Sequence, residues 1–346
     1  MIKRICFAAL ILVLVHCIFG AGAAAQTPNP CLAVTLWYFP DPILIGWVYY
    51  GPGQGNYSYN ITAPLAACPP PDAPQETSPR CPFCGSPISL ATGTTYIDES
   101  DLRIPGLGGG LSLTRTWISQ WPASQSALQN GMFSPNWRST YEERVFMVYE
   151  NLFMYSVNYL KYSRADGSFW SFAFGGGGGL AAPQNVSASL TIPTTANPYW
   201  TILFQNGEQR RFDSTTGKLT TIIDRNGNTT QLTYDGANRL VTVTDPASRH
   251  LTFTYSSSSS SLVTGVSSDV GLSLTYTYDA QGRLSQVTKP DLTTYSFAYD
   301  SHSLITSVTD SSGKILESHS YDGSGRGLTS SRAQGVEAVG ISYPNP

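Results

Sequence analysis

A polar run with the letters DRNGN, residues 224–228, has the composition of a cation-binding loop. Calcium takes carboxylate and amide oxygens, and an EF-hand loop places Gly sixth and a bidentate Glu twelfth. Here Gly227 is fourth and Asp235 is twelfth, so the spacing fails. The pair Asn226 and Gly227 is instead the preferred two-residue type I′ hairpin turn. We therefore predict a hairpin turn at this place and no metal ion.

Carboxylates cluster once, at Asp98, Glu99 and Asp101. A glycosidase needs two carboxylates that flank a bond across a cleft, whereas adjacent side chains on a strand point to opposite faces. The glycine run 175–179 lacks the G-K-[ST] of a phosphate loop, and no G-x-S-x-G occurs. The histidines fit no metal-binding spacing: His16, His250, His302 and His319. We predict no catalytic residue, no cofactor and no metal ion.

The first 25 residues have the pattern of a secretory signal peptide. Lys3 and Arg4 precede an apolar run from Ile5 to Phe19, and small residues then lead to a predicted cleavage before Gln26. No later window is long and apolar enough for a membrane span, so we expect no integral membrane segment after cleavage. The expected location is outside the cell or at its surface, with the periplasm as an alternative.

The cysteines that remain after cleavage are Cys31, Cys68, Cys81 and Cys84. In an exported chain they predict disulfides, for which three connectivities are open. Zinc is an alternative, because Cys81-Pro82-Phe83-Cys84 resembles one zinc knuckle, although no second C-x-x-C completes it. A redox C-x-x-C is a further alternative, without the βαβ pattern that usually surrounds one.

Composition and spacing divide the rest of the chain. Charged residues are 12% and the net charge is −3, so no basic field is present for nucleic acid. The counts of 32 Gly, 23 Pro and 20 Tyr favour an all-β, turn-rich fold. Residues 26–66 are aromatic and Pro-rich, 67–80 read as a Pro-rich linker, 81–208 as a strand-rich domain, and 209–346 as repeats.

The repeats are the strongest pattern in the sequence. Successive aromatic residues, mostly followed by Asp, are spaced 22, 21, 23, 21 and 22 residues apart, which is typical of stacked supersecondary units. These residues are Phe212, Tyr234, Tyr255, Tyr278, Tyr299 and Tyr321. A second shared position needs a left-handed backbone, since it holds Gly or Asn: Gly217, Asn238, Gly282 and Gly325. Each of about five units is predicted to be a β-hairpin.

The expected turn at Asn226 and Gly227 sets the strand register of one hairpin. A two-residue tip opposes Ile223 with Thr230, Thr221 with Leu232, and Leu219 with Tyr234. This pairing predicts one buried face formed by Leu219, Ile223, Leu232 and Tyr234.

The amino-acid sequence of these units resembles that of the Rhs or YD-repeat family. Units such as YDAQGRL and VTDSSGK carry the likeness, as do the stretches GSPISLATGTTYIDESDLRIPGLGGGLSLTRTWIS, FSPNWRSTYEERV, RADGSFWSF and FQNGEQRRFD, together spanning residues 81–328. The resemblance implies an N-terminal Rhs-associated β domain followed by an open, curved antiparallel sheet of hairpins. Full-length bacterial members carry many more repeats, a self-cleaving segment and a toxin domain. Their absence here implies an incomplete shell, either a fragment or a short stand-alone module.

The recurring Tyr and basic residues leave two functions open. Stacked Tyr can bind sugar rings, which makes Tyr278 and Tyr299 candidate sugar contacts. Alternatively, Tyr packs between hairpins while Arg pairs with Asp across the turns. We therefore expect an exported, non-enzymatic Rhs/YD-repeat protein that serves as a structural or surface-interaction module, or as the opening part of a toxin-encapsulating shell. Its partners would be the rest of a shell, a cell-surface protein or, in the second reading, carbohydrate, but not nucleic acid.

Overall fold

A computed structural model gives the fold. It describes residues 31–37, 42–49, 88–89, 92–121, 130–152, 155–174, 180–183, 186–332, 335 and 337–343. The predicted signal peptide, the Pro-rich linker, the glycine run, Cys68, Cys81 and Cys84 lie outside the described residues, as does the side chain of Cys31. The described part is all-β, as predicted, apart from one 3-10 turn, η1 (Leu107–Gly109).

Three small sheets precede the main sheet. Strands β1 (Cys31–Trp37) and β2 (Pro42–Tyr49) form an antiparallel hairpin. Strands β3 (Tyr96–Ile104), β4 (Leu111–Ile118) and β7 (Trp137–Ser139) form a three-stranded sheet, which we call the inner sheet. The short pair β5 (Asn130–Gly131) and β6 (Ser134–Pro135) leads into β7.

The main sheet runs through the rest of the described chain, each strand antiparallel to the next. It begins with β8 (Arg144–Leu152), β9 (Tyr155–Ser163), β10 (Phe169–Phe174), β11 (Leu180–Ala181), β12 (Ala188–Thr191), β13 (Tyr199–Phe204) and β14 (Gln209–Asp213). The repeats continue with β15 (Leu219–Ile223), β16 (Thr229–Tyr234), β17 (Leu240–Thr244), β18 (His250–Tyr255), β19 (Val263–Ser268), β20 (Ser273–Tyr278), β21 (Leu284–Thr288), β22 (Thr294–Tyr299), β23 (Ile305–Asp310), β24 (Ile315–Tyr321), β25 (Gly327–Arg332) and β26 (Glu337–Gly340).

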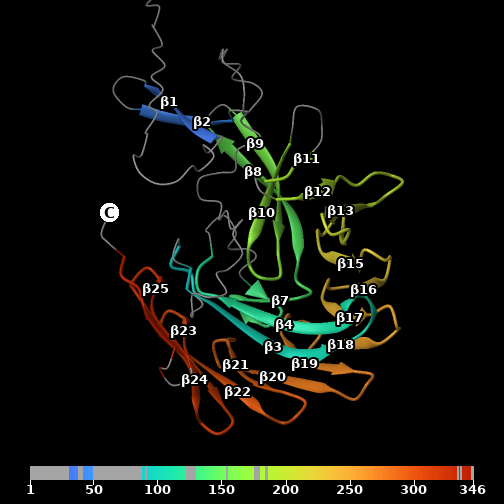
Figure 1. Cartoon of the computed structure of the whole chain (residues 1–346), viewed down its shortest axis with the longest axis vertical. Helices are drawn as coiled ribbons and strands as arrows, with labels where there is room; N and C mark the ends of the chain where they lie inside the picture. Colours follow the sequence, from blue (N-terminus) through green and yellow to red (C-terminus); the bar gives the residue numbers. More distant parts are fainter. Residues whose placement is uncertain are drawn as a thin grey trace, which may run out of the picture.

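The sheet closes on itself at one place near its start. Arg144 at the beginning of β8 bridges Lys218 just before β15, and the N–H of Val145 donates to the carbonyl of Gly217 at 2.9 Å. Strands β8 to β15 therefore form a ring. Strands β16 to β26 continue from it as the expected open, curved sheet (Figure 1).

Every described repeat contains a β-bulge at the start of the strand that follows its first turn. Tyr234 pairs with Leu240 and Thr233 with Thr242, so Val241 is the extra residue. A bulge shifts the alternation of faces by one residue, which turns both Leu240 and Val243 to the buried side. The spacing L-x-x-V of these units, which suggests a helix period, is thus a property of bulged strands.

The DRNGN turn lies where the sequence placed it, but its type and register differ from the prediction. Asp224 pairs with Asn228 and the N–H of Gly227 donates to the carbonyl of Asp224, which leaves a three-residue loop. Gly227 has φ +85° and Asn226 is not among the residues with positive φ, so this is not a type I′ turn.

The longer loop moves the pairing of β15 and β16 by one residue. Ile223 opposes Thr229 and Ile222 opposes Thr230. Ile222, rather than Ile223, therefore packs against the core with Leu219 and Leu232. The predicted buried face was wrong at this position because the prediction assumed a two-residue loop and no β-bulge.

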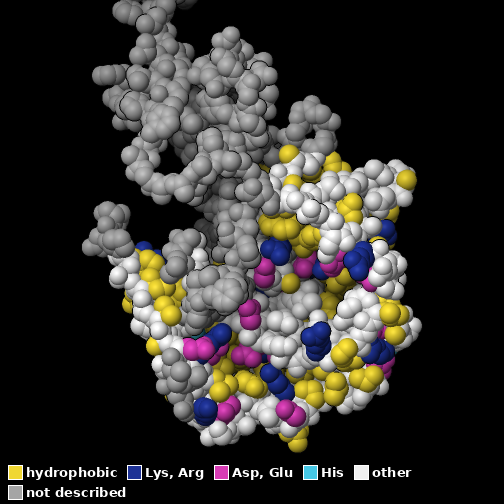
Figure 2. Space-filling model, viewed as in Figure 1, with side chains coloured by type: hydrophobic (Ala, Val, Ile, Leu, Met, Phe, Trp, Pro, Cys, Tyr) yellow, Lys and Arg dark blue, Asp and Glu magenta, His cyan; other side chains and the backbone are white. Residues whose placement is uncertain are grey.

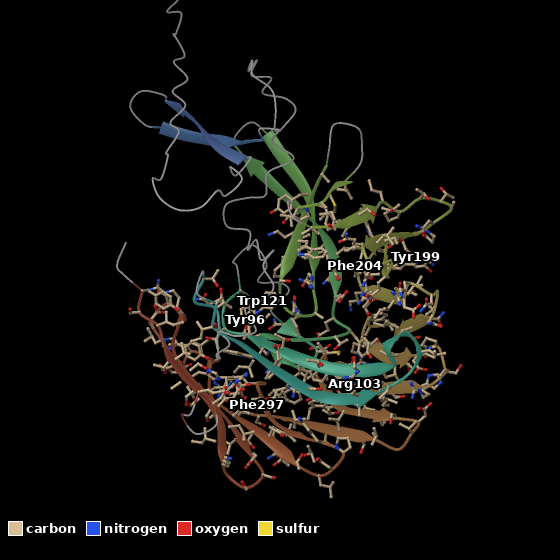
Figure 3. All side chains as sticks on the ribbon, in the orientation of Figure 1. Tyr96, Arg103, Trp121, Tyr199, Phe204 and Phe297 are labelled. Carbon is tan, nitrogen blue, oxygen red and sulfur yellow. The ribbon has the colours of Figure 1, made fainter. Side chains whose placement is uncertain are left out.

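The inner sheet lies against the concave face of the repeats (Figure 1). Aromatic side chains of the inner sheet, and Phe133 and Tyr141 beside it, pack on one ring from each of several repeats. The centroid distances are 6.3 Å for Tyr141 and Phe253, 4.7 Å for Phe133 and Tyr276, 5.2 Å for Trp137 and Phe297, and 6.4 Å for Trp117 and Tyr321. Phe297 lies where the repeat strands meet the inner sheet (Figure 3). The inner sheet and the repeats thus share one hydrophobic core.

Charged side chains are scattered over the face of the molecule seen in Figure 2. Lys and Arg lie close to Asp and Glu there, among hydrophobic and uncharged side chains, without a broad patch of one sign. In the part of the chain that the structure describes, no helix is long and apolar enough to cross a membrane.

Candidate functional site

The repeat tyrosines connect each unit to the one before it. Each hydroxyl donates a hydrogen bond to the carbonyl of the first residue of the preceding unit's bulged strand. The O–O distances are 2.7 Å for Tyr234 and Leu219, 2.8 Å for Tyr255 and Leu240, 2.5 Å for Tyr278 and Val263, 2.8 Å for Tyr299 and Leu284, and 2.8 Å for Tyr321 and Ile305. The bulge draws this carbonyl out of the regular ladder, so the hydroxyl supplies its partner.

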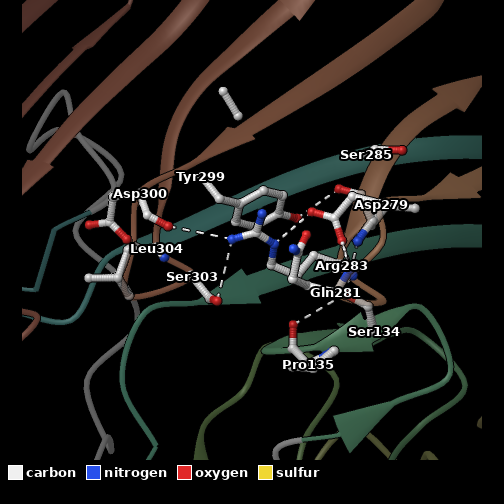
Figure 4. Close-up of polar contacts among 12 residues, drawn as sticks. Ser134, Pro135, Asp279, Gln281, Arg283, Ser285, Tyr299, Asp300, Ser303 and Leu304 are labelled. Carbon is white, nitrogen blue, oxygen red and sulfur yellow. Dashed lines mark hydrogen bonds and ion pairs between the residues drawn. The ribbon is translucent and has the colours of Figure 1, made fainter.

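The basic residue of a unit has two contacts. Arg283 binds Asp279 of its own turn, with Nε 2.7 Å from Oδ2, and its guanidinium lies 4.7 Å from the ring centroid of Tyr299 in the next unit. It also reaches Ser303 and the carbonyl of Asp300 (Figure 4). Arg239 repeats this arrangement. Each unit is therefore joined to its successor by a cation over a ring as well as by a hydroxyl.

These contacts describe the packing alternative for the tyrosine ladder. The rings of Tyr278 and Tyr299 are half-buried and pack against the core, and their hydroxyls are already bonded to the backbone. Sugar binding by the same two residues stays a prediction.

Replacing Tyr299 by Phe should lower the free energy of unfolding by about 1 kcal/mol, because it removes one hydroxyl-to-carbonyl bond and keeps the ring. Urea unfolding followed by tryptophan fluorescence measures the loss. Tyr199→Phe is the control, since Tyr199 lies in β13, before the repeats, and should change stability by no more than about 0.5 kcal/mol. Equal effects of the two substitutions would contradict the inter-unit role.

The turn carboxylates give the repeats an expected response to acid. The hydrogen bond from Arg239 lowers the pKa of Asp235, and the backbone N–H of Arg326 lowers the pKa of Asp322. A carboxyl whose folded pKa is depressed stabilises the fold above its unfolded value of about 3.9 and loses that effect as pH falls through the folded pKa. We expect the melting temperature to fall steeply below about pH 4. An Asp235→Asn variant should show a shallower fall; an unchanged slope would contradict the assignment.

A buried ion pair within the inner sheet is bonded to the repeats through Tyr276. Arg115 of β4 is fully buried and binds Asp101 of β3 through two nitrogens, with Nη2 2.9 Å from Oδ1. Tyr276 of β20 donates its hydroxyl to the same carboxylate at 2.8 Å. The guanidinium also lies 4.5 Å from the ring centroid of Trp137. Burial lowers the pKa of Arg115, but the charge and hydrogen bond of Asp101, with the nearby Tyr276 and Glu99, together outweigh burial and raise the pKa overall.

The backbone joins the two parts at the repeat bulges as well. The N–H of Val263 donates to the carbonyl of Met132 at 2.9 Å, and the N–H of Leu284 to the hydroxyl of Ser134 at 3.2 Å. The N–H of Gly327 donates to the carbonyl of Gly93 at 2.8 Å. Each donor is the first residue of a bulged strand, the same residue whose carbonyl accepts a tyrosine. Residues in the segment 93–134 therefore accept hydrogen bonds from equivalent positions in different repeats.

The carboxylate cluster that sequence singled out does not assemble a cleft. Asp101 is the extra residue of a β3 bulge between Ser100 and Leu102, and it points inward to Arg115. Asp98 accepts a hydrogen bond from Thr116 at 2.6 Å. Burial raises the pKa of Glu99 to about 6, against the lowering effect of Arg115. The contacts of Asp101 are those of a structural residue.

The described histidines lie apart from one another. His250 bonds Thr244, with Nδ1 2.9 Å from Oγ1, His302 is exposed in a turn, and His319 is buried beside Glu317. Among the described residues, no group of three or more His, Cys, Asp or Glu side chains could hold a metal ion.

The second shared position of the repeats has the left-handed backbone. Gly217, Asn238, Gly282 and Gly325 have φ values of +67°, +60°, +75° and +78°. Ser303 takes this place in the Tyr299 unit, with φ +64°.

Sequence reasoning missed three residues of these contacts. Tyr343 donates its hydroxyl to the carbonyl of Gly327 at 2.7 Å and lies under Arg326, as a further member of the ladder. Its spacing of 22 residues from Tyr321 was the available signal. Arg115 and Tyr276 had no such signal, because the alternating pattern of a strand does not distinguish an Arg or Tyr that forms a buried contact from one on the surface.

Two family models match parts of this chain. A family model described as a domain of unknown function, DUF6531, matches residues 85–172, and the RHS repeat model matches residues 213–250 and 259–294. No curated protein matches. The described fold is similar to a solved structure of the Photorhabdus luminescens Tc holotoxin pore, with 13% identity over 68% of this chain and a TM-score of 0.29. A crystal structure of TcdB2-TccC3 without its hypervariable C-terminal region has 12% identity over 68% of this chain, with a TM-score of 0.28. This chain spans 14% of the length of each.

Proposed function

We propose that this chain, which carries RHS repeats behind a DUF6531 domain, is an exported, non-enzymatic protein that forms the opening part of an Rhs-type shell. The observation that carries the proposal is the inner sheet on the concave face of the repeats. A stack of hairpins leaves an open end, and repeat proteins need a terminal unit that covers it. The inner sheet and the ring of β8 to β15 have the position of such a unit.

The spacing of the contacts supports a role in setting curvature. The acceptors on Met132, Ser134 and Gly93 meet donors of three different repeats. Gly327 stands where other units have Leu, Val or Ile, and a Cβ there would lie 2.6 Å from Oγ1 of Thr95. The two parts therefore match in shape as well as in hydrogen bonding, so the inner sheet can act as the template on which the first repeats wind.

A chimera tests the shell role. Residues 85–343 of this chain would replace the matching domain and first repeats of a toxin-bearing Rhs protein. We expect the enclosed toxin of the soluble chimera to resist protease as in the parent protein. A matched chimera that lacks residues 92–139, which include the inner sheet, should leave the toxin open to digestion. If the first chimera is soluble and its toxin is digested at the rate of free toxin, the proposal fails.

Export is the second part of the proposal. It is supported by the signal-peptide pattern of the first 25 residues. Cell fractionation and N-terminal sequencing should find the protein outside the cytoplasm with Gln26 as its first residue. Recovery of the uncleaved chain from the cytoplasm would contradict it.

Carbohydrate binding through the tyrosine ladder is the alternative function. Tyr278→Ala and Tyr299→Ala distinguish it, because a sugar-binding role requires glycan-array signals that these changes remove. The structural role instead predicts that any glycan signal of the unaltered protein survives both changes, which should cause the loss of stability described above.

A further inference from the structure

A cavity of about 260 Å³ lies between the N-terminal region and the first two repeats. Arg138 and Arg144 line it from one side, and Lys218, Asn238 and Tyr234 from the other. Ligand sites favour such junctions between structural units. The volume is below the range of drug-sized sites, so it suits a small molecule.

Three cations of this cavity have no ion pair with any described residue. Arg138 is 5% exposed, its Nε has no hydrogen-bond partner in the described chain, and its guanidinium lies 4.6 Å from the ring centroid of Trp121. Nε of Arg144 donates to the carbonyl of Thr216 at 3.1 Å. Nζ of Lys218 donates to the carbonyl of Asn238. Carbonyls solvate these charges but do not neutralise them.

The carboxylates around the cavity compensate little of this charge. Glu143 is occupied by Arg210 at 3.2 Å and by the hydroxyl of Tyr162 at 2.6 Å. Glu142 accepts the N–H of Met132 through one oxygen, and its other oxygen is buried without a partner among the described residues. Burial raises the pKa of Glu142 and the charge of Arg138 lowers it, so this carboxyl offsets at most one of the three cations. The cavity therefore has a surplus of positive charge.

Lys218 departs from the pattern of its repeat in a way that supplies this charge. Arg239 and Arg283 follow the Asp of their turn by four residues and bind it. Lys218 follows Asp213 by five residues, and that carboxylate instead accepts the N–H groups of Thr215 and Thr216. The extra residue turns the basic side chain away from its own Asp and into the cavity.

We propose that this cavity binds an acidic monosaccharide, with its carboxylate held by Lys218, Arg144 and Arg138. A carboxylate or phosphate forms charge-assisted hydrogen bonds with such groups. Lys218 lies over the ring of Tyr234 and Arg239 over the ring of Tyr255. The polar groups of Asn130, Asn238 and Ser261, rather than these rings, therefore favour a hydroxylated ligand over a bare inorganic ion. The site is separate from Tyr278 and Tyr299 and does not depend on the shell proposal.

Titration calorimetry of the full-length protein with glucuronate, glucose, glucose 6-phosphate and inorganic phosphate tests the proposal. We expect saturable binding of glucuronate, weaker binding at high salt, and none of glucose. Lys218→Gln should weaken glucuronate binding by roughly tenfold, the loss typical of one charged hydrogen bond. Arg225→Gln, which removes an exposed charge in the turn after β15, is the matched control and should bind as the parent does.

Three results would overturn the proposal. One is equal binding of glucose and glucuronate, which would show that charge is not recognised. Another is binding of the phosphate compounds alone, which would indicate a phosphate or adventitious ion site. The third is glucuronate binding that Lys218→Gln leaves unchanged. Arg138→Gln is not needed for this decision, since that buried residue also packs on Trp121 and its loss can unfold the protein.

Discussion

Replacing Asp101 by Asn should lower the free energy of unfolding by about 3–5 kcal/mol, the typical cost of breaking a buried pair. The substitution keeps the size of the side chain but removes the charge that compensates Arg115. Arg115 is completely buried among the rings of Trp137, Tyr276 and Phe297, so water cannot replace the lost carboxylate. Urea unfolding of the purified protein measures the effect.

Two controls separate this effect from a general sensitivity to substitution. Asp291→Asn removes a carboxylate from an exposed turn and should change stability by no more than about 0.5 kcal/mol. The combined variant Asp101→Leu, Arg115→Met and Tyr276→Phe removes both charges and the hydroxyl bonded to them. It should recover most of the lost stability, because an apolar replacement of a buried pair is often neutral. A loss below about 1 kcal/mol in Asp101→Asn would show that compensation of the buried Arg115 by Asp101 contributes little to stability.

Gly217→Ala should cost about 2–3 kcal/mol more than Gly282→Ala, although both glycines occupy the same repeat position. Both have positive φ, so both substitutions carry the left-handed strain of about 1 kcal/mol. A Cβ on Gly282 would meet nothing within 4 Å, whereas one on Gly217 would lie 1.8 Å from the carbonyl oxygen of Val145. Only the first repeat has β8 beside it at this place.

Hydrogen exchange identifies the origin of that difference. In Gly217→Ala the amide of Val145 should lose protection, because its hydrogen bond to the carbonyl of Gly217 closes the ring of β8 to β15. In Gly282→Ala the same amide should exchange as in the parent protein. Equal unfolding costs for the two substitutions would show that the ring contributes nothing to stability.

Several features of this fold could be predicted because their causes are local. Glycine or asparagine at the second shared position of a unit indicates a left-handed backbone, and Asp at the start of a turn caps the following amides. The period of 21 to 23 residues indicates stacked hairpins. The strand register could not be predicted, since one additional loop residue and one bulge per unit each shift it by one residue.

The amino-acid sequence by itself determined the repeat period, the all-β class and the positions of the tyrosine ladder, because alternation and turn chemistry act within about ten residues of chain. Only the tertiary structure decided which residues make the contacts between successive repeats and between the inner sheet and the repeats. Asp101 and Tyr276 are 175 residues apart, and the turn that sends Lys218 into the cavity differs from its neighbours by one inserted residue. Partners this distant share no local pattern, so only the packing of the inner sheet on the curved repeats brings them together.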